Sequence, residues 1–220
     1  MKTPTRICTA MDDALLKLHA WLSPAYPVGA FSYSHGLEWA VQAGDVTGAD
    51  TLSAWIETIL RHGTGRTDAI LIAHAMRGGD ADELDALARA LCASRERLLE
   101  TETQGAAFAT TIAASWGGDP TPRAYPVAVA LAARDHGILP RDTIAVYLQA
   151  FAGNLVSAGI RLIPVGQTDG QRILARLHPV VTAIADDALT AALDDVGGCA
   201  MLGDIAAMRH ETQTVRLFRS

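Results

Sequence analysis

Apolar residues recur every three or four positions along most of this sequence, which is the spacing of one face of an α-helix. The clearest stripe begins after Arg141 and ends at Pro164, because proline cannot continue a helix. A second stripe spans 173–184 and contains Pro179, which predicts a kink or a break. The first stripe consists of Ile144, Leu148, Phe151, Leu155 and Leu162. This periodicity restricts the chain to a largely helical fold.

Helical stripes also occupy most of the remaining chain, whereas strand-like alternation over five or more residues is almost absent. Alanine is the commonest residue and the best helix former. The further stripes are 15–22, 34–43, 52–62, 68–76, 82–92, 96–116 and 127–135. We therefore predict an all-α, single-domain helical bundle of roughly eight to ten helices.

No linker divides the chain into separate domains. The Gly- and Pro-rich stretch 117–122 is the best internal break, and its length suits a loop between two helices. We expect one domain over 1–220, with 1–11 flexible and 209–220 forming a partner-binding tail. Leu217 and Phe218 cannot bury well at a free end, so this tail docks either on its own body or on a partner.

Charge and composition exclude several classes of protein. The chain has 18 basic and 24 acidic residues, a net charge of -6, whereas nucleic-acid binders carry a basic excess. Its longest fully apolar stretch, 127–133, is much shorter than the ~20 residues of a membrane span. Three scattered cysteines without a CxxC pair predict reduced thiols, and the N-terminus lacks an apolar signal core. We therefore expect a cytoplasmic protein that binds neither nucleic acid nor membrane.

Familiar enzyme motifs are missing from the sequence. There is no Gly-Lys pair for a P-loop and no Gly-x-Ser-x-Gly nucleophile elbow. His210 lacks the second histidine that a zinc-protease helix requires. Glu100 and Glu102, like Asp186 and Asp187, are interpreted as solvated helix faces. We predict no catalytic, cofactor-binding or metal-binding residues, and hence a protein that is not an enzyme.

Three segments carry more glycine and polar residues than a plain bundle needs: 22–38, 157–171 and 204–220. In the first, Phe31 and Tyr33 lie at a turn, where they either anchor a partner or pack inward. In the second, Arg161 lies one turn from a helix end, where the helix dipole alone also favours a cation. The glutamines and glycines that follow Arg161 favour an exposed hydrogen-bonding surface.

These three segments together resemble the UreF family of urease accessory proteins. The matching motifs are Ser-Pro-Ala-x-Pro-Val-Gly-x-Phe-Ser-Tyr-Ser-x-Gly-Leu-Glu (23–38), Arg-Leu-x-Pro-x-Gly-Gln-Thr-Asp-Gly-Gln (161–171) and Met-Arg-His-Glu-Thr-Gln-x-x-Arg-Leu-Phe-Arg-Ser (208–220). The resemblance covers about residues 12 to 220. Ala30, His35 and Val165 depart from the usual Gly, Gln and Leu of the motifs.

The resemblance implies a non-catalytic adaptor in the cytoplasm. Proteins of this family are all-α, form dimers, and work with the GTPase UreG and the scaffold UreD, called UreH in some species. The assembly acts on apo-urease and inserts nickel into its active site. The chain would then link UreD to UreG and modulate GTP hydrolysis. Nickel would be cargo of the complex, and GTP would bind to UreG.

We assign partner-binding roles to the motif residues as hypotheses. The tail would order against UreD and the Tyr33 turn, while the Arg161 to Gln171 turn would help to form a patch facing UreG. The helix over 141–163 is our candidate for the dimer seam. The partner-binding residues are Phe31, Tyr33, Glu38, Arg161, Gln167, Asp169, Gln171, His210, Glu211, Arg216, Leu217 and Phe218.

Three other readings remain open from the sequence. One is an all-α enzyme with a site assembled from His35, Glu38, His210 and Glu211. The second is a nickel carrier that acts alone. The third is a generic helical module that regulates a GTPase unrelated to urease.

Overall fold

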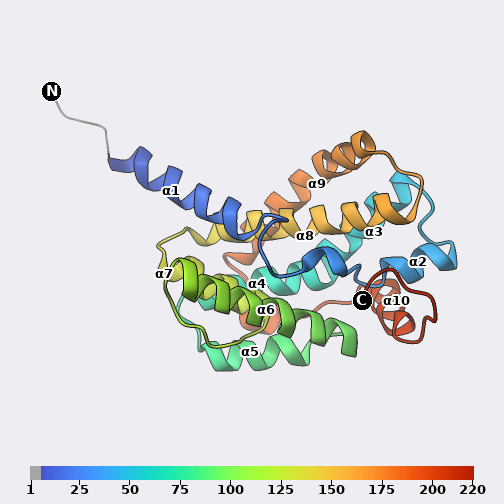
Figure 1. Cartoon of the computed structure of the whole chain (residues 1–220). Coiled ribbons are helices and arrows are strands. Elements are labelled where there is room, and N and C mark those ends of the chain that lie inside the picture. The colour runs from blue at the N-terminus through green and yellow to red at the C-terminus, as the bar shows by residue number, and fades with distance from the viewer. Residues whose placement is uncertain (1–5) are drawn as a thin grey trace.

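The computed structural model describes residues 6–220, and all the secondary structure within them is helical (Figure 1). The α-helices are α1 (Arg6–Trp21), α2 (Leu37–Ala43), α3 (Ala49–His62), α4 (Thr64–Met76), α5 (Ala81–Ala90), α6 (Arg95–Ser115), α7 (Tyr125–Asp135), α8 (Pro140–Leu162), α9 (Gln167–Ala188) and α10 (Met201–His210). Short 3-10 turns, η1 (Ala30–Ser32) and η2 (Leu193–Asp195), lie in two of the connections. The predicted all-α bundle is confirmed.

Helix α4 forms the centre of the bundle. It packs against α3, α5, α7, α8 and α9, and every residue from Thr67 to Ala73 is buried. Its sequence is apolar on nearly all sides, which is the pattern of a helix surrounded by other helices. Helices α7, α8 and α9 cover this central helix, and α6 packs on α7 outside it.

The helix boundaries follow local signals in the sequence. The side chains of Asp80 and Ser94 accept backbone N–H groups at the starts of α5 and α6. Proline lies in the first turn of both α7 and α8, where no N–H partner is needed. Helix α9 continues through Pro179, so the break that this residue could have caused is absent.

Helix α10 is the element that the periodicity does not reveal. Its apolar residues surround the helix axis instead of forming one stripe, so no helix was expected in this segment. In the structure α10 packs on α2 and α6, and the chain turns back beside it. Of the predicted flexible segment 1–11, residues 1–5 lie outside the described residues, and the remainder belongs to α1.

By length and composition alone, helix α8 is long and apolar enough to cross a membrane. Buried helices in the core of a protein meet the same two criteria. Within the most apolar stretch of α8, 50% is buried in this fold. It packs against α2, α3, α4, α7 and α9, and these neighbours account for its apolar character.

A glycine permits the contact between α2 and α10. Gly36 has φ +75°, and a Cβ placed on it would lie 2.5 Å from the backbone nitrogen of Ala207. A side chain at this position would therefore be both strained and in collision with the α10 backbone. The close approach of α2 to α10 places the last turn of α10 beside Glu38.

Candidate functional site

Residues 211–220 fold back onto the chain's own body instead of extending from it. The Arg219 N–H donates to the Ser32 carbonyl oxygen at 2.8 Å, and the Ser34 N–H donates to the Ser220 carbonyl oxygen at 2.8 Å. The Ser34 hydroxyl donates to the same oxygen at 2.5 Å. The first and third sequence motifs are thus joined directly through their backbones.

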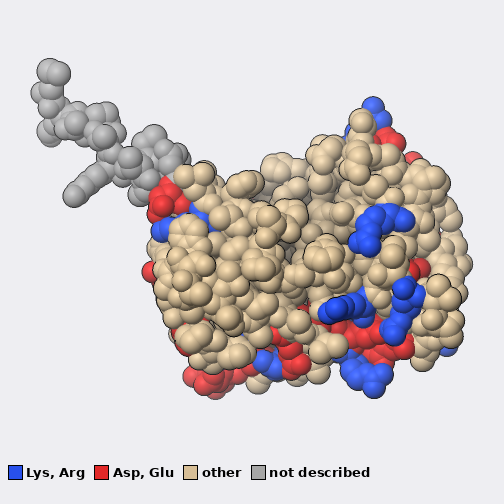
Figure 2. Space-filling view, viewed as in Figure 1, with Lys and Arg blue, Asp and Glu red and all other residues tan. Residues whose placement is uncertain are grey.

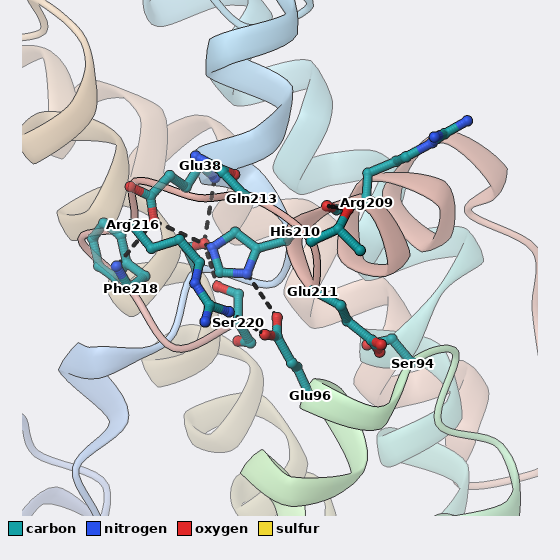
Figure 3. A network of polar contacts seen from close by, with 12 residues as sticks. Glu38, Ser94, Glu96, Arg209, His210, Glu211, Gln213, Arg216, Phe218 and Ser220 are labelled. Carbon is teal, nitrogen blue, oxygen red and sulfur yellow. Dashed lines mark hydrogen bonds and ion pairs between the residues drawn. The ribbon is translucent and has the colours of Figure 1, made fainter.

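Glu38, in the first turn of α2, organises the tail (Figure 3). Its carboxylate accepts the backbone N–H groups of Leu217 at 2.7 Å and Phe218 at 2.9 Å. The side chain of Glu38 is buried, so these charge-assisted hydrogen bonds are shielded from water. A single carboxylate therefore holds two consecutive residues of the tail.

His210 lies between two carboxylates and is 0% exposed. Its Nε2 is 3.2 Å from Glu38 Oε2, and its Nδ1 is 2.7 Å from Glu96 Oε2. Each ring nitrogen is therefore within hydrogen-bond distance of a different carboxylate. Arg216 donates to the other oxygen of Glu96, Oε1, at 2.5 Å. We call Glu38, Glu96, His210 and Arg216 the tail cluster.

Arg161 links the second motif to the other two. Its guanidinium carbon lies 4.4 Å from the centre of the Phe218 ring, a cation–π geometry. The same guanidinium donates to the Phe31 carbonyl oxygen at 3.1 Å. Phe218 is buried beneath it, whereas the Phe31 side chain is 68% exposed. All three motifs thus meet at this end of the bundle.

A second ionic cluster, which we call the α6 cluster, consists of His35, Arg97 and Glu100 behind the tail. His35 Nε2 is 2.9 Å from Glu100 Oε1, and Arg97 forms an ion pair with Glu100. The Ser220 hydroxyl donates to Glu100 Oε2 at 2.8 Å, which connects this cluster to the tail. Glu100 is only 3% exposed, so its interpretation as a solvated helix face is wrong. Sequence spacing alone did not reveal that two distant segments, which contain His35 and Ser220, cover this part of α6.

Burial and charge act in opposite directions on the α6 cluster. Burial raises the pKa of Glu100, but the Arg97 guanidinium and His35 outweigh it and lower this pKa to about 2. Burial, reinforced by the positive charge of Arg97, lowers the pKa of His35 below its ordinary value. Glu100 is therefore an anion that Arg97 neutralises, while His35 favours its neutral form.

A small polar cavity of about 60 Å³ lies between the 22–31 loop, α6 and α8. Its wall includes Asp68, whose carboxylate accepts the Tyr147 hydroxyl at 2.7 Å. Burial raises the pKa of Asp68 to about 6, despite the opposing hydrogen bond from Tyr147. His35 Nδ1 and the Tyr26 hydroxyl are buried, and neither has a hydrogen-bond partner among the described residues.

The predicted partner-binding residues fall into two groups by exposure. Tyr33, Glu38, His210 and Phe218 are buried within this chain and hold the tail in place. The other eight are exposed or partly exposed: Phe31, Arg161, Gln167, Asp169, Gln171, Glu211, Arg216 and Leu217.

The glutamine-containing turn after α8 is separate from the tail contacts. Asp169 pairs with Arg172 within α9, at 2.7 Å between Oδ1 and Nη1. Within residues 6–220, no hydrogen bond or ion pair connects Gln167, Asp169 or Gln171 to the tail. Arg161 is the residue of this motif that contacts the tail through its charged group.

The sequence analysis missed several residues that build the site. Ser34, Glu96, Arg97 and Ser220 all contact the tail or the α6 cluster, yet they were not selected. Ser34 also accepts the Glu38 N–H at 3.3 Å, as expected of a serine before a helix. The sequence gives little indication of these contacts, because Glu96 and Arg97 look like ordinary charged residues in the first turn of α6.

The four residues of the possible enzyme site have different partners. His210 contacts Glu38, but His35 faces Glu100, and Glu211 accepts the backbone N–H of Arg95 at 2.7 Å. In the part of the chain that the structure describes, no group of three or more His, Cys, Asp or Glu side chains is arranged to hold a metal ion.

Sequence similarity to known proteins identifies the family of this chain. A family model described as UreF matches residues 46–178. A urease accessory protein UreF from Cereibacter sphaeroides strain KD131 is 55% identical over 96% of this chain and 100% of its own length. The chain belongs to the UreF family. UreF proteins from Rhodopseudomonas palustris strain BisB18 and Bradyrhizobium strain BTAi1 are 49% and 48% identical, covering 97% and 96% of this chain and 95% of their own lengths.

Membership of the UreF family makes this chain a urease accessory protein and supports a role in urease maturation. The family model ends before the tail, whereas the alignments with whole UreF proteins cover nearly the entire chain. The three motifs that resembled UreF in the sequence are the segments that meet around Phe31, Glu38 and Phe218.

Proposed function

We propose that this UreF-family chain is a non-catalytic adaptor that links UreD, or UreH, to the GTPase UreG during nickel insertion into apo-urease. In this role it modulates GTP hydrolysis by UreG, nickel passes through the complex as cargo, and no cofactor is held by this chain. The assembly works in the cytoplasm. Family membership supports the link to urease, and the motif resemblance supports the partners.

The observation that carries this proposal is the composite surface built by the three motifs. The tail, the Phe31 turn and the end of α8 meet through Arg161 and Glu38. Exposed side chains of Phe31, Arg216 and Leu217 surround the buried anchors. A surface built from such distant segments and centred on aromatic and arginine side chains suits recognition by a protein partner.

The docked tail defines how UreD would be bound. The buried members Glu38, His210 and Phe218 fix the path of the tail, and the exposed Leu217 and Arg216 then face UreD. The tail is thus presented in one shape before the partner arrives, which lowers the entropy cost of binding.

The turn after α8 is assigned to UreG. Gln167 and Gln171 are exposed, and Asp169 and Arg161 add charge of both signs. Because Arg161 also contacts the tail, the UreG patch and the UreD surface would share an edge.

Helix α8 is assigned to a homodimer seam. Ala145, Val146, Ala150 and Gly153 are only partly buried within one chain. A Cβ placed on Gly153 would meet nothing within 4 Å, so a second helix has room to approach there. A monomeric mass in solution at micromolar protein concentration would contradict this assignment.

Co-expression of the chain with UreD and UreG tests the proposal. We expect the three proteins to be isolated as one complex and urease to be activated only when this chain is present. Deletion of residues 209–220 should abolish co-purification with UreD while the circular dichroism remains helical. Unchanged co-purification would refute the assigned role of the tail, and substrate turnover by the isolated chain would refute the adaptor role.

Two further measurements distinguish the adaptor function from the two alternatives, a nickel carrier that acts alone and a GTPase-regulating module unrelated to urease. A calorimetric titration with nickel should show no tight binding of one ion per chain, which a carrier acting alone would require. Normal urease maturation in cells lacking this chain would instead favour a GTPase-regulating module unrelated to urease.

A further inference from the structure

All four tyrosines of this chain line one cavity, the polar cavity of about 60 Å³ between the 22–31 loop, α6 and α8. Tyr26 and Tyr33 lie between α1 and α2, Tyr125 begins α7, and Tyr147 lies in α8. Tyr33 and Tyr147 are only 4% and 5% exposed. The fold therefore gathers its phenol side chains around a single internal space.

Most of these tyrosine hydroxyls have no partner within the chain. The Tyr147 hydroxyl donates to Asp68 at 2.7 Å. In contrast, the hydroxyls of Tyr26, Tyr33 and Tyr125 form no hydrogen bond with any residue in 13–220. A buried tyrosine hydroxyl usually has a hydrogen-bond partner, because its lost hydration otherwise costs free energy. Three unpartnered hydroxyls around one cavity point to a partner inside it.

The cavity has the size of a very small molecule. One water needs roughly 10–15 Å³ of such space, so the cavity of about 60 Å³ holds roughly four waters or one molecule of about four non-hydrogen atoms. Its lining combines the aromatic rings of the tyrosines and Phe151 with the side-chain amides of Gln104 and Asn154. Such a lining suits a flat molecule that both donates and accepts hydrogen bonds.

The charges in the cavity wall favour an uncharged molecule. Arg97 and Glu100 form an ion pair, so their charges already offset each other. Arg97 would repel a cation, whereas Glu100 and Asp68 would repel an anion. A charge added to a buried site costs more free energy than a neutral hydrogen-bonding group. The surface over the 22–31 loop, which crosses the front of the bundle in Figure 1, is also largely uncharged in Figure 2.

We propose that this tyrosine-lined cavity binds one small, planar, uncharged amide of about four non-hydrogen atoms, the chemistry of acetamide and urea. The N–H groups and carbonyl oxygen of an amide supply the donors and the acceptor that the tyrosine hydroxyls and Asn154 lack. The site goes beyond the proposed adaptor function, because it requires no partner protein. It lies next to the tail, since Glu100 in its wall also accepts the Ser220 hydroxyl.

Nuclear magnetic resonance of the full-length chain with labelled tyrosine rings tests this proposal. Each ring signal reports on the cavity, because all four tyrosines line it. We expect acetamide and urea, titrated separately to about 50 mM, to shift these signals along a saturable curve with a dissociation constant in the millimolar range. This concentration of urea is far below those that unfold proteins.

A hydroxyl deletion tests whether the tyrosines bind the amide. Tyr125→Phe removes one unpartnered hydroxyl and should weaken acetamide binding at least fivefold. The matched control Thr58→Val removes an exposed hydroxyl of α3 outside the cavity and should leave the affinity unchanged. If Tyr125→Phe fails to fold by circular dichroism, Tyr33→Phe replaces it, with the same direction of effect. Equal affinity in the wild type and the folded phenylalanine variant would overturn the proposal.

Charged molecules of the same shape test the class of ligand. Acetate is the anionic counterpart of acetamide, and guanidinium is the cationic counterpart of urea; each should bind at least tenfold more weakly. Guanidinium that binds as tightly as urea would overturn the preference for a neutral molecule. If neither amide gives a saturable shift, the cavity holds only water, and the proposal is overturned. These experiments need neither UreD nor UreG, so their failure would leave the proposed adaptor function untouched.

Discussion

Ser34 and Ser220 lie 186 residues apart in the sequence, yet the N–H and the hydroxyl of Ser34 both donate to the Ser220 carbonyl oxygen, at 2.8 Å and 2.5 Å. Ser34 is fully buried, and Ser220 is 1% exposed. The last residue of the chain is therefore part of the packed interior, and the tail is as much a structural element as the helices that it contacts.

Glu38→Gln should release the tail. A glutamine has one acceptor oxygen and an NH₂ group, so it cannot accept from His210 and from the N–H groups of Leu217 and Phe218 as the carboxylate does. We expect a loss of about 1–3 kcal/mol in the free energy of unfolding. Hydrogen exchange should accelerate in 214–220. The control Glu57→Gln removes an exposed pair with Arg61 and should cost less than about 1 kcal/mol; equal effects of the two variants would contradict the role of Glu38.

Gly36→Ala should separate α2 from α10. The new Cβ would be 2.5 Å from the Ala207 nitrogen in a residue with φ +75°. Gly44→Ala is the matched control, since Gly44 has φ +86° but nothing within 4 Å of a Cβ. Conformational strain alone should cost the control about 1–2 kcal/mol. Urea unfolding should show a clearly larger loss for Gly36→Ala, and similar losses would mean that the close approach is easily relaxed.

Asp68→Asn should stabilise the protein, and more so at high pH. The folded-state pKa of Asp68 is raised to about 6 from 3.8, so ionisation of this carboxyl opposes folding as the pH rises through this interval. Asparagine keeps an acceptor for the Tyr147 hydroxyl and removes this cost. The stabilisation relative to wild type should grow by about 1–2 kcal/mol between pH 5 and pH 8. Urea unfolding at both pH values measures it, and a constant difference would refute the raised pKa.

Arg161→Glu should weaken recruitment of UreG more than tenfold, which corresponds to about 1.4 kcal/mol. The substitution removes the cation from the Phe218 ring and the donor from the Phe31 carbonyl oxygen. Arg176→Glu is the control, because Arg176 pairs with the exposed Asp50 at the molecular surface. Affinity for UreG measured by calorimetry decides the question: unchanged affinity in Arg161→Glu would count against the assigned patch.

Most of the helical framework was predictable from local patterns. The stripe of apolar residues after Arg141 corresponds to α8, and the 96–116 stripe corresponds to α6 within one residue at each end. Helix α10 was missed because Met201, Ile205 and Met208 on one face and Ala206 and Ala207 on the other cancel the periodic signal. A helix with apolar residues on both faces shows no preferred side in the sequence.

The site was predictable in its three segments, but not in all of its residues or in its arrangement. The motifs that contain Tyr33, Arg161 and Phe218 were selected from the sequence, and the structure brings these segments together. Which of their residues are buried was not predictable, since Phe31 and Tyr33 are near neighbours with opposite exposure. Glu100 was misread for the same reason: besides Arg97 in the same helix, it contacts His35 and Ser220, which approach it only in the folded chain.

The sequence by itself determined the fold class and the family, because helical periodicity and motif order are properties of neighbouring residues along the chain. Only the tertiary structure decided that the tail closes on Glu38 and that His210 lies between two carboxylates. These contacts join residues more than a hundred positions apart. Burial and charge pairing depend on every segment that surrounds a group, and no local pattern carries that information.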